Sequence, residues 1–243
     1  EIKQTNNQPV KLFDELSNNM NVVSSVKPKQ TQLKIHNALP IINHLNNDPK
    51  VKIALPQVKT QVFYVAGAIE LNGIVTGINP KDESAYFNFH NYIVSGNAED
   101  LENNSNAILI GIGAAKKMSL KMGDRVQLAT AKGDIIPLKI VGFFQSGLAD
   151  IDNVQSYVNL KTAQRILGEN ESYITDINLK LHNIEDAVPM AKMLSKQYNL
   201  TAIDINTANA QFETGTSIRN LITYAVSFTL LIVAGFVIYN ILN

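Results

Sequence analysis

The final stretch of the chain constrains the fold more than any other feature. Residues 221–242 run for 22 positions without Asp, Glu, Lys, Arg or Pro. As a helix this run would measure about 33 Å, enough to cross a hydrocarbon layer of about 30 Å. Tyr224 and Tyr239 lie near its ends, where aromatic rings favour the membrane interface. We therefore predict one transmembrane helix, over residues 217–243, rather than a buried core helix.

The two ends of the sequence indicate a piece of a larger protein. The uncharged run stops one residue before the last position. The first residues, EIKQTNNQPV, show no basic segment followed by an apolar one, so they do not resemble a signal peptide. We expect a fragment of a membrane protein, from which an earlier membrane segment has been trimmed.

Composition narrows the function of the remaining residues. The chain has 243 residues, with 21 basic and 21 acidic side chains, so its formal net charge is zero. Nucleic-acid binding calls for a surplus of Lys and Arg, and we expect no nucleic-acid partner. Hydrophobic residues make up 45% of the chain, which excludes a disordered tail. Cysteine is absent, so disulfides, thiolate zinc sites and cysteine nucleophiles are excluded.

A weak internal repeat organises the part before the membrane run. Each block reads as strand, helix and strand, at residues 22–26, 38–45 and 51 into 61–65, and again at 175–181, 187–198 and 201–205. Pro189 falls at the third position of the second helix, where its missing N–H has no acceptor, and Asn199 can end that helix in the left-handed conformation. The pattern predicts an α+β fold with a porter-like subdomain of βαβ repeats.

A smaller β-rich subdomain interrupts the repeat. Its clearest element is a hairpin around the Lys132-Gly133-Asp134 turn, with alternating apolar residues on both sides. A short helix follows at residues 160–167, with Asn159 as its cap and Gly168 as its stop. We expect four segments: the porter-like subdomain at residues 1–65 and 154–216, the inserted subdomain at 66–153, and the membrane helix at 217–243.

The chain shows no motif for catalysis or cofactor binding. There is no P-loop, and Gly111 and Gly113 lack the third glycine of a dinucleotide fingerprint. Ser146 does not stand in a nucleophile elbow. Four histidines show no ligand spacing: His36, His44, His90 and His182. We expect no catalytic residue, no cofactor-binding residue and no metal ligand, and therefore not an enzyme.

Two clusters each admit two interpretations. Asp150 and Asp152 would share one face of an extended segment and could meet a cation or a basic partner, or they could serve turn formation and solvation beside Asn153. Four aromatic residues could form an exposed pad for a hydrophobic ligand such as an acyl chain, or belong to the core: Tyr86, Phe87, Phe89 and Tyr92.

An ordered string of short motifs resembles a known family. The string comprises ILIG at 108–111, Ala114-Ala115, Leu120, GDRV at 123–126, IVGFF at 140–144, Ser146-Gly147, DID at 150–152, Tyr157-Val158 and AQRIL at 163–167. It is similar to the extracytoplasmic domain of FtsX-like ABC transporter permeases, the MacB-type periplasmic core domain, and most like the lipoprotein-releasing (Lol-type) branch. The resemblance spans about residues 20–243.

The resemblance implies a four-helix permease whose external domain lies between its first and second membrane helices. It implies a bacterial inner-membrane location with the large domain in the periplasm. The implied partners are a cytoplasmic ABC ATPase subunit, separate or fused, and a second permease copy or paralogue. The implied function couples cytoplasmic ATP hydrolysis to extraction or export of a lipoprotein or another hydrophobic substrate.

One departure affects the expected partners. The Lol-type subunit that recruits a carrier chaperone extends a long hairpin before the strand that corresponds to residues 135–144 here. The equivalent connection in this chain is only residues 131–134, which puts docking of a lipoprotein carrier in doubt. Two other functions remain open: a single-pass membrane-anchored binding or sensor protein, and a cell-division type permease that activates a wall hydrolase.

Overall fold

A computed structural model describes residues 2–4 and 34–242, and its centre is one mixed sheet. The strand order is β10-β1-β9-β2-β3-β8-β5-β7-β4, with β6 paired to β2 and β7. The strands are β1 (Ile2–Gln4), β2 (Val51–Ala66), β3 (Ile69–Ile78), β4 (Ile93–Ser95), β5 (Ala107–Gly111), β6 (Arg125–Thr130), β7 (Ile135–Phe144), β8 (Gln155–Asn159), β9 (Asp176–Leu181) and β10 (Leu200–Ala202). The α-helices are α1 (Ala38–Asn46), α2 (Pro80–Phe87), α3 (Asp100–Asn103), α4 (Ile112–Lys117), α5 (Ala149–Asp152), α6 (Leu160–Leu167), α7 (Ala187–Tyr198) and α8 (Ile205–Leu242).

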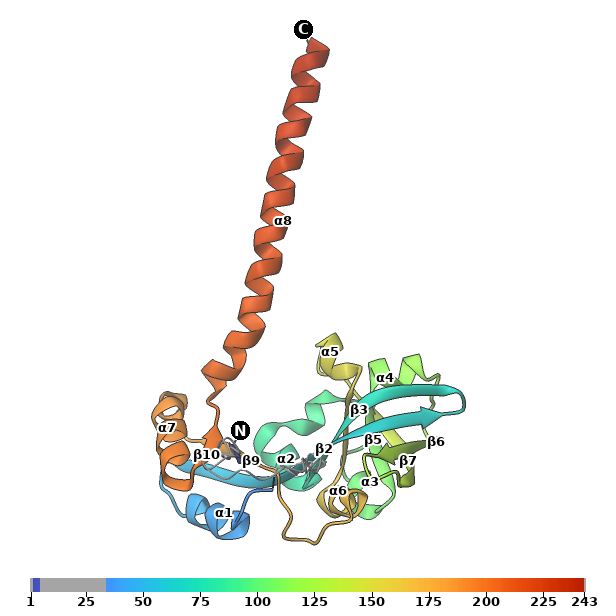
Figure 1. The fold of residues 1–243 in the computed structure, drawn as a ribbon, viewed down its shortest axis with the longest axis vertical. Helices are drawn as coiled ribbons and strands as arrows, with labels where there is room; N and C mark the ends of the chain where they lie inside the picture. Colours follow the sequence, from blue (N-terminus) through green and yellow to red (C-terminus); the bar gives the residue numbers. More distant parts are fainter. Residues whose placement is uncertain (1, 5–33, 243) are drawn as a thin grey trace, which may run out of the picture.

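The first lobe consists of two interleaved βαβ repeats. Strand β1 pairs antiparallel with both β9 and β10, and β2 pairs antiparallel with β9. The units β1-α1-β2 and β9-α7-β10 therefore alternate along the sheet, and α1 and α7 lie beside it in Figure 1. Apolar residues of both helices and of these strands form one buried cluster, which includes Ile41, Leu45, Ile177 and Leu194. The repeat predicted from the sequence exists, but its first strand is β1.

Local sequence signals explain the elements of this lobe. Helix α7 occupies the predicted residues and carries Pro189 at its third position, where the ring displaces no helical hydrogen bond. Asn199 ends it at φ 52°, as expected for a left-handed stop. The predicted strand 175–181 is β9. The predicted strand 201–205 is shorter, because Asp204 already begins the first turn of α8. The predicted strand 22–26 lies outside the described residues.

The second lobe is built around the other half of β2. Residues 58–66 of β2 pair with β3, and β3 continues in parallel to β8. A large apolar cluster packs β5, β6, β7, β8 and α6 together and includes Val62, Ile108, Leu138, Val158 and Ile166. A smaller cluster surrounds Phe89, Leu101 and Leu109. Because β2 is one uninterrupted strand, a single sheet serves both lobes.

The predicted hairpin and the helix after it are both present. Strands β6 and β7 pair antiparallel, and the turn between them closes when the Thr130 amide donates to the Asp134 carbonyl at 2.9 Å. Gly133 has φ 91°, a conformation that favours glycine. Helix α6 begins where the Asn159 side chain accepts from the Lys161 amide at 3.1 Å, and it ends at Gly168 with φ 66°.

The hydrophobic cores divide the chain differently from the predicted subdomain boundaries. The boundary at residue 153 falls between α5 and β8, yet Val158 of β8 and Ile166 of α6 pack into the core of the second lobe. The reason is that β8 pairs with β3 and β5 instead of with the first lobe. The division into subdomains at residues 65 and 153 stays a prediction. The structure shows a mixed arrangement of helices and strands.

The last element is a long helix. Helix α8 runs from Ile205 to Leu242 and rises away from the first lobe, beside α7 and β10 (Figure 1). Within the residues that the structure describes, no helix meets the length and hydropathy needed to cross a bilayer. The predicted transmembrane helix is therefore not confirmed.

Candidate functional site

The residues considered for catalysis or metal binding do not gather in one place. All four histidines are exposed: His36, His44, His90 and His182, which directly follows β9. Across the described residues, no group of three or more His, Asp or Glu side chains is placed to hold a metal ion.

The Asp150 and Asp152 pair has a structural role. The extended conformation considered for this segment is wrong, because both residues lie in the short helix α5. Asp150 is exposed, whereas Asp152 is buried and accepts from the Ser146 amide at 2.6 Å and from the Ser146 hydroxyl at 2.8 Å. Its other oxygen accepts from the Gly147 amide. Asp152 thus shapes the turn between β7 and α5, as the second interpretation expected.

The aromatic cluster divides between the core and the surface. Phe89 is buried and packs edge-on against Tyr157, with ring centroids 4.8 Å apart. Phe87 lies half-buried at the end of α2, with the Lys180 ammonium 5.6 Å from its ring centroid. Tyr92 is exposed. The four rings do not form one pad for a ligand.

The base of α8 is the first candidate site. Asp204 lies two residues after the end of β10, and its carboxylate accepts from the amides of Asn206 and Thr207, both at 3.0 Å, and from the Thr207 hydroxyl. These hydrogen bonds, led by the one from the Thr207 hydroxyl, lower the pKa of Asp204. An acidic cap also suits the positive end of the helix dipole. Only Ile203 and the cap residue separate β10 from α8, so the connection is short and hydrogen-bonded.

A largely apolar groove lies against this base. It encloses about 580 Å³ and is lined by residues of β9, α7, β10 and the first turn of α8, together with Phe87. The apolar lining includes Leu179, Ile184, Met190 and Ile205. A volume in this range, lined mainly by apolar side chains, is typical of ligand pockets. Near the groove, a hydrogen bond connects α7 to β10, because the Ser195 hydroxyl accepts from the Ala202 amide at 3.1 Å.

The second candidate site is a buried polar network between the lobes. Glu83 of α2 is only 5% exposed. Its carboxylate accepts from the Gln57 side-chain Nε2 at 2.6 Å, and the Asn178 side chain also hydrogen-bonds to it. Burial is the main cause of a raised pKa at Glu83, and these hydrogen bonds and the Lys59 charge oppose it. Lys59 in turn pairs with Asp176 at 3.8 Å.

Sequence reasoning found neither candidate site. The groove is formed by apolar side chains that look like ordinary core residues in the sequence. The polar network joins residues 57, 83 and 178, which are far apart along the chain. One signal was present, because Gln57 and Lys59 stand at alternate positions of the strand, which puts them on one face.

The motif string that carries the family resemblance has a clear structural meaning. Its residues supply much of the core of the second lobe, where Ile108, Ala114, Val126, Ile140 and Ala163 are fully buried or nearly so. Gly111 and Gly142 lie where a Cβ atom would come within 2.3 Å of neighbouring backbone oxygens. Much of the string therefore reflects the close packing of the second lobe.

Comparisons with known proteins agree with this string. The family described as the MacB-like periplasmic core domain matches residues 3–197. The lipoprotein-releasing system transmembrane protein LolC of Neisseria meningitidis serogroup B is 22% identical over 209 residues, which cover 81% of this chain and 50% of that protein. The chain thus spans about half the length of the curated relative that it matches.

Two solved structures are similar to this chain at lower sequence identity. The extracellular domain of the noncanonic ABC-type transporter YknZ from Gram-positive bacteria shares 16% identity, with a TM-score of 0.47 over 66% of this chain and 83% of that one. The periplasmic region of MacB from Actinobacillus actinomycetemcomitans shares 14% identity, with a TM-score of 0.49 over 72% of this chain and 82% of that one. The assignment depends on the family match, which covers most of the sequence and confirms the resemblance to FtsX-like permeases: the chain belongs to the family of MacB-like periplasmic core domains.

Proposed function

We propose that this chain is the extracytoplasmic domain and one adjoining membrane helix of an ABC transporter permease. In this proposal the permease couples ATP hydrolysis by a cytoplasmic subunit to extraction or export of a lipoprotein or another hydrophobic substrate. The observation that carries it is α8, a continuous helix of 38 residues that starts two residues after β10 and is capped by Asp204. A movement of this helix would reach the first lobe without a flexible linker to absorb it.

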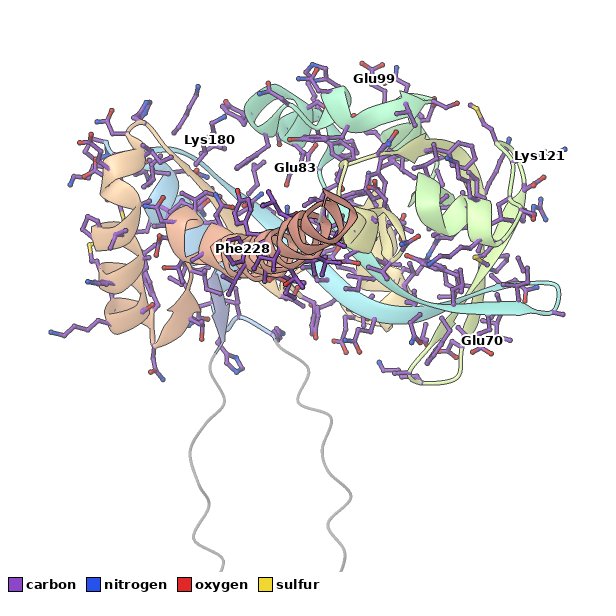
Figure 2. All side chains as sticks on the ribbon, turned by 90° about the horizontal axis from the view of Figure 1, so that it is seen from above. Glu70, Glu83, Glu99, Lys121, Lys180 and Phe228 are labelled. Carbon is purple, nitrogen blue, oxygen red and sulfur yellow. The ribbon has the colours of Figure 1, made fainter. Side chains whose placement is uncertain are left out.

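The end of α8 is proposed to lie in the bilayer. The sequence from Leu221 onward carries no charged residue as far as Leu242. Its large apolar side chains are exposed along the described part of the helix, with Tyr224 and Leu231 both 71% accessible and Phe228 66% (Figure 2). Apolar side chains exposed all round a helix favour a lipid environment over water.

The strand register places the start of β1 on the same side of the sheet as the exit into α8. Ile2 of β1 pairs with Ala202 of β10, and the two strands are antiparallel. The start of β1 therefore lies beside the end of β10, which leads into α8, near the label N in Figure 1. This arrangement suits a domain inserted between two successive membrane helices, with the domain in the periplasm and the helices in the inner membrane of a bacterial cell.

The remaining features of the proposal come from the family. We propose a cytoplasmic ABC ATPase and a second permease copy or paralogue as partners, and no catalytic role for this chain. The short turn at residues 131–134 offers little surface for a lipoprotein carrier. We also retain the division into a porter-like subdomain at 1–65 and 154–216 and an inserted subdomain at 66–153.

The coupling can be tested in the helical segment between the lobe and the membrane run. Insertion of a flexible glycine linker within residues 211–220 of the full-length parent should leave ATP hydrolysis measurable but abolish export. The matched control is the same insertion in the turn at residues 131–134, which is exposed and far from α8. Export that continues unchanged after the insertion in α8 would reject the coupling.

The groove beside α8 favours a second candidate, a single-pass membrane-anchored binding or sensor protein that works without ATP. The two functions predict different partners. A pull-down of the detergent-solubilised full-length parent, followed by mass spectrometry, should recover a P-loop ATPase in stoichiometric amount if the permease function is right. Its absence under mild detergent would favour the sensor, and recovery of an activated wall hydrolase would favour the cell-division type.

A further inference from the structure

A polar cavity lies on the sheet where it passes from one lobe to the other. It encloses about 290 Å³ and is lined by residues of four neighbouring strands, β9, β2, β3 and β8, with Ile151 of α5 at its side. The lining residues are Gln57, Lys59, Thr76, Ile151, Gln155, Tyr157, Ile177 and Asn178. The space would hold a group about as large as one amino-acid side chain.

The strand register places the polar residues on one face. Lys59 pairs with Thr76, and Thr76 pairs with Tyr157, which makes a row across β2, β3 and β8. Gln57 and Gln155 lie two positions before Lys59 and Tyr157, so their side chains share that face. The alternate positions, among them Val58, Val75 and Val158, are fully buried in the apolar core. Polar side chains in the middle of a large sheet are the exception, and they call for a partner.

Existing hydrogen bonds fix the orientation of the amide groups. The Gln57 Nε2 donates to Glu83, and the Asn178 amide is bound to the same carboxylate. The Gln155 Nε2 donates to the Thr76 hydroxyl at 2.6 Å and to the Ser156 carbonyl at 3.1 Å. Each NH₂ group donates to at least one partner, whereas no hydrogen bond within the described residues uses the side-chain carbonyl oxygens, which are therefore left for a ligand. Three residues that line the cavity therefore keep an open carbonyl acceptor.

Tyr157 adds a further polar group. Its hydroxyl makes no hydrogen bond within the described part of the chain, although the side chain lines the cavity. Burial, followed by the charge of Glu83, raises the pKa of Tyr157 to about 12, so the hydroxyl stays protonated and can donate or accept. An aromatic hydroxyl of a half-buried side chain that lines the same cavity as three amides with open carbonyl oxygens is suited to a ligand that carries several N–H donors.

The fixed charges around the cavity decide the sign of that ligand. Lys59 faces two carboxylates, because it pairs with Asp176 at 3.8 Å and also acts on Glu83. Asp152 adds a third negative charge that acts on Tyr157. Lys59 lines the cavity itself and is offset by its partner Asp176, while Glu83 and Asp152 lie outside the lining and leave the balance of these four groups negative. In a partly buried site such charges act more strongly than in water. An anion would meet this balance unfavourably.

We propose that this cavity binds a guanidinium or ammonium group of side-chain size, held by the carbonyl oxygens of Gln57, Gln155 and Asn178 and by the Tyr157 hydroxyl. Glu83 is a positioning residue, since it orients two of these amides from behind and supplies the negative charge. A ligand held there contacts β9 and β2 on one side and β3 and β8 on the other, so it bridges the two lobes.

Calorimetric titration of the 243-residue chain in detergent tests the proposal. The probe is N-acetyl-arginine amide, and its matched neutral analogue is N-acetyl-citrulline amide, which has nearly the same shape. We expect the arginine probe to bind at least about tenfold more tightly, because hydrogen bonds to a charged group are the stronger ones. Methylguanidinium, titrated in parallel, shows whether the cation alone suffices or the attached backbone is needed.

Two variants connect binding to this cavity. Tyr157→Phe should weaken the arginine probe about fivefold, the effect of one hydrogen bond. Glu83→Gln keeps an acceptor for Gln57 but loses the charge, and it should weaken the probe about tenfold. Tyr173→Phe makes the same chemical change in a tyrosine that does not line the cavity, and it should leave affinity unchanged while circular dichroism confirms folding.

Three results would overturn the proposal. The first is no heat of binding for either cation at millimolar concentration. The second is equal affinity for the arginine and citrulline probes, which would show that charge plays no part. The third is preferential binding of acetate, lost in Lys59→Met, which would make the cavity an anion site.

Discussion

The two lobes share one sheet but are held together by different means. The first lobe has two helices on short antiparallel strands and a single apolar cluster. The second lobe has a larger cluster and also close backbone packing, with several glycines placed where a Cβ atom would clash. We infer that the second lobe behaves as a rigid body, whereas the first lobe, which carries α8, is the part suited to move.

The largest expected effect comes from matched truncations of the two cores. Leu138→Ala in β7 and Leu194→Ala in α7 each remove a side chain that is at most 1% exposed. Each should destabilise its own lobe by about 3 kcal/mol. Urea unfolding followed by hydrogen exchange would show which amides lose protection. Loss of protection confined to the mutated lobe supports separate rigid bodies, and equal loss in both lobes contradicts them.

Close packing in the second lobe predicts the next effect. A Cβ atom on Gly73 would lie 2.1 Å from the Tyr64 ring, whose hydroxyl is held by Ser156 at 2.7 Å and by two backbone carbonyls. Gly73→Ala should therefore cost about 2 kcal/mol, because the ring has no free position to move to. Gly67→Ala is the control for the same chemical change, at a turn with open space but φ 60°.

Thermal unfolding of both variants measures this difference. Gly67→Ala introduces no steric clash, so only its backbone conformation should destabilise the protein, by about 1 kcal/mol. If Gly73→Ala is the milder of the two, the second lobe is less tightly packed than its structure indicates.

The junction between the lobes predicts a pH dependence. Burial raises the folded-state pKa of Glu83 above its unfolded value, so the folded protein binds the proton more readily. Stability should then fall as the pH rises from the unfolded value of about 4.3 through the folded pKa. Glu83→Gln removes this slope and should be the more stable form on the alkaline side. Melting temperatures of both forms between pH 4 and 8 test the sign, and identical slopes would contradict it.

The smallest effect is expected at the cap of α8. Asp204→Ala removes acceptors for the Asn206 and Thr207 amides, so the first turn of α8 should fray. Hydrogen exchange at residues 206–208 should quicken, while amides of β9 and α7 keep their protection. Asp204→Asn, which retains an acceptor, should restore most of it. Faster exchange throughout the first lobe would show that the cap holds more than the helix start.

Local signals predicted much of this fold. Helices α6 and α7 and the β6-β7 hairpin follow from stripes, caps and turn residues that lie within a few positions of one another. Strand β1 was missed because its three residues include one apolar side chain and so show no alternation of apolar and polar positions. Strand β2 was predicted as one strand from residue 51 into 61–65, and the structure confirms it over Val51–Ala66. Its Gln57 and Lys59 lie on the polar face between the lobes.

The candidate sites were harder to predict than the fold. The groove at α8 needs β9, α7 and β10 to meet, and the cavity needs four strands in register. Neither condition is visible in spacing along the chain. The extended conformation expected for Asp150 and Asp152 was wrong for a related reason, because hydrogen bonds from Ser146 and Gly147 to the Asp152 carboxylate hold this segment in a helical turn.

The pairing of β1 with β10 gives the molecule a directional mechanical response. The three residue pairs run antiparallel, and the start of β1 lies beside the exit into α8. If the two ends are drawn the same way, the pair moves as one piece and its hydrogen bonds carry little tension. If the ends are drawn apart sideways, the bonds open one after another from Ile2 and Ala202, as a zipper does. The domain would therefore follow a piston stroke faithfully and yield when its two connections spread.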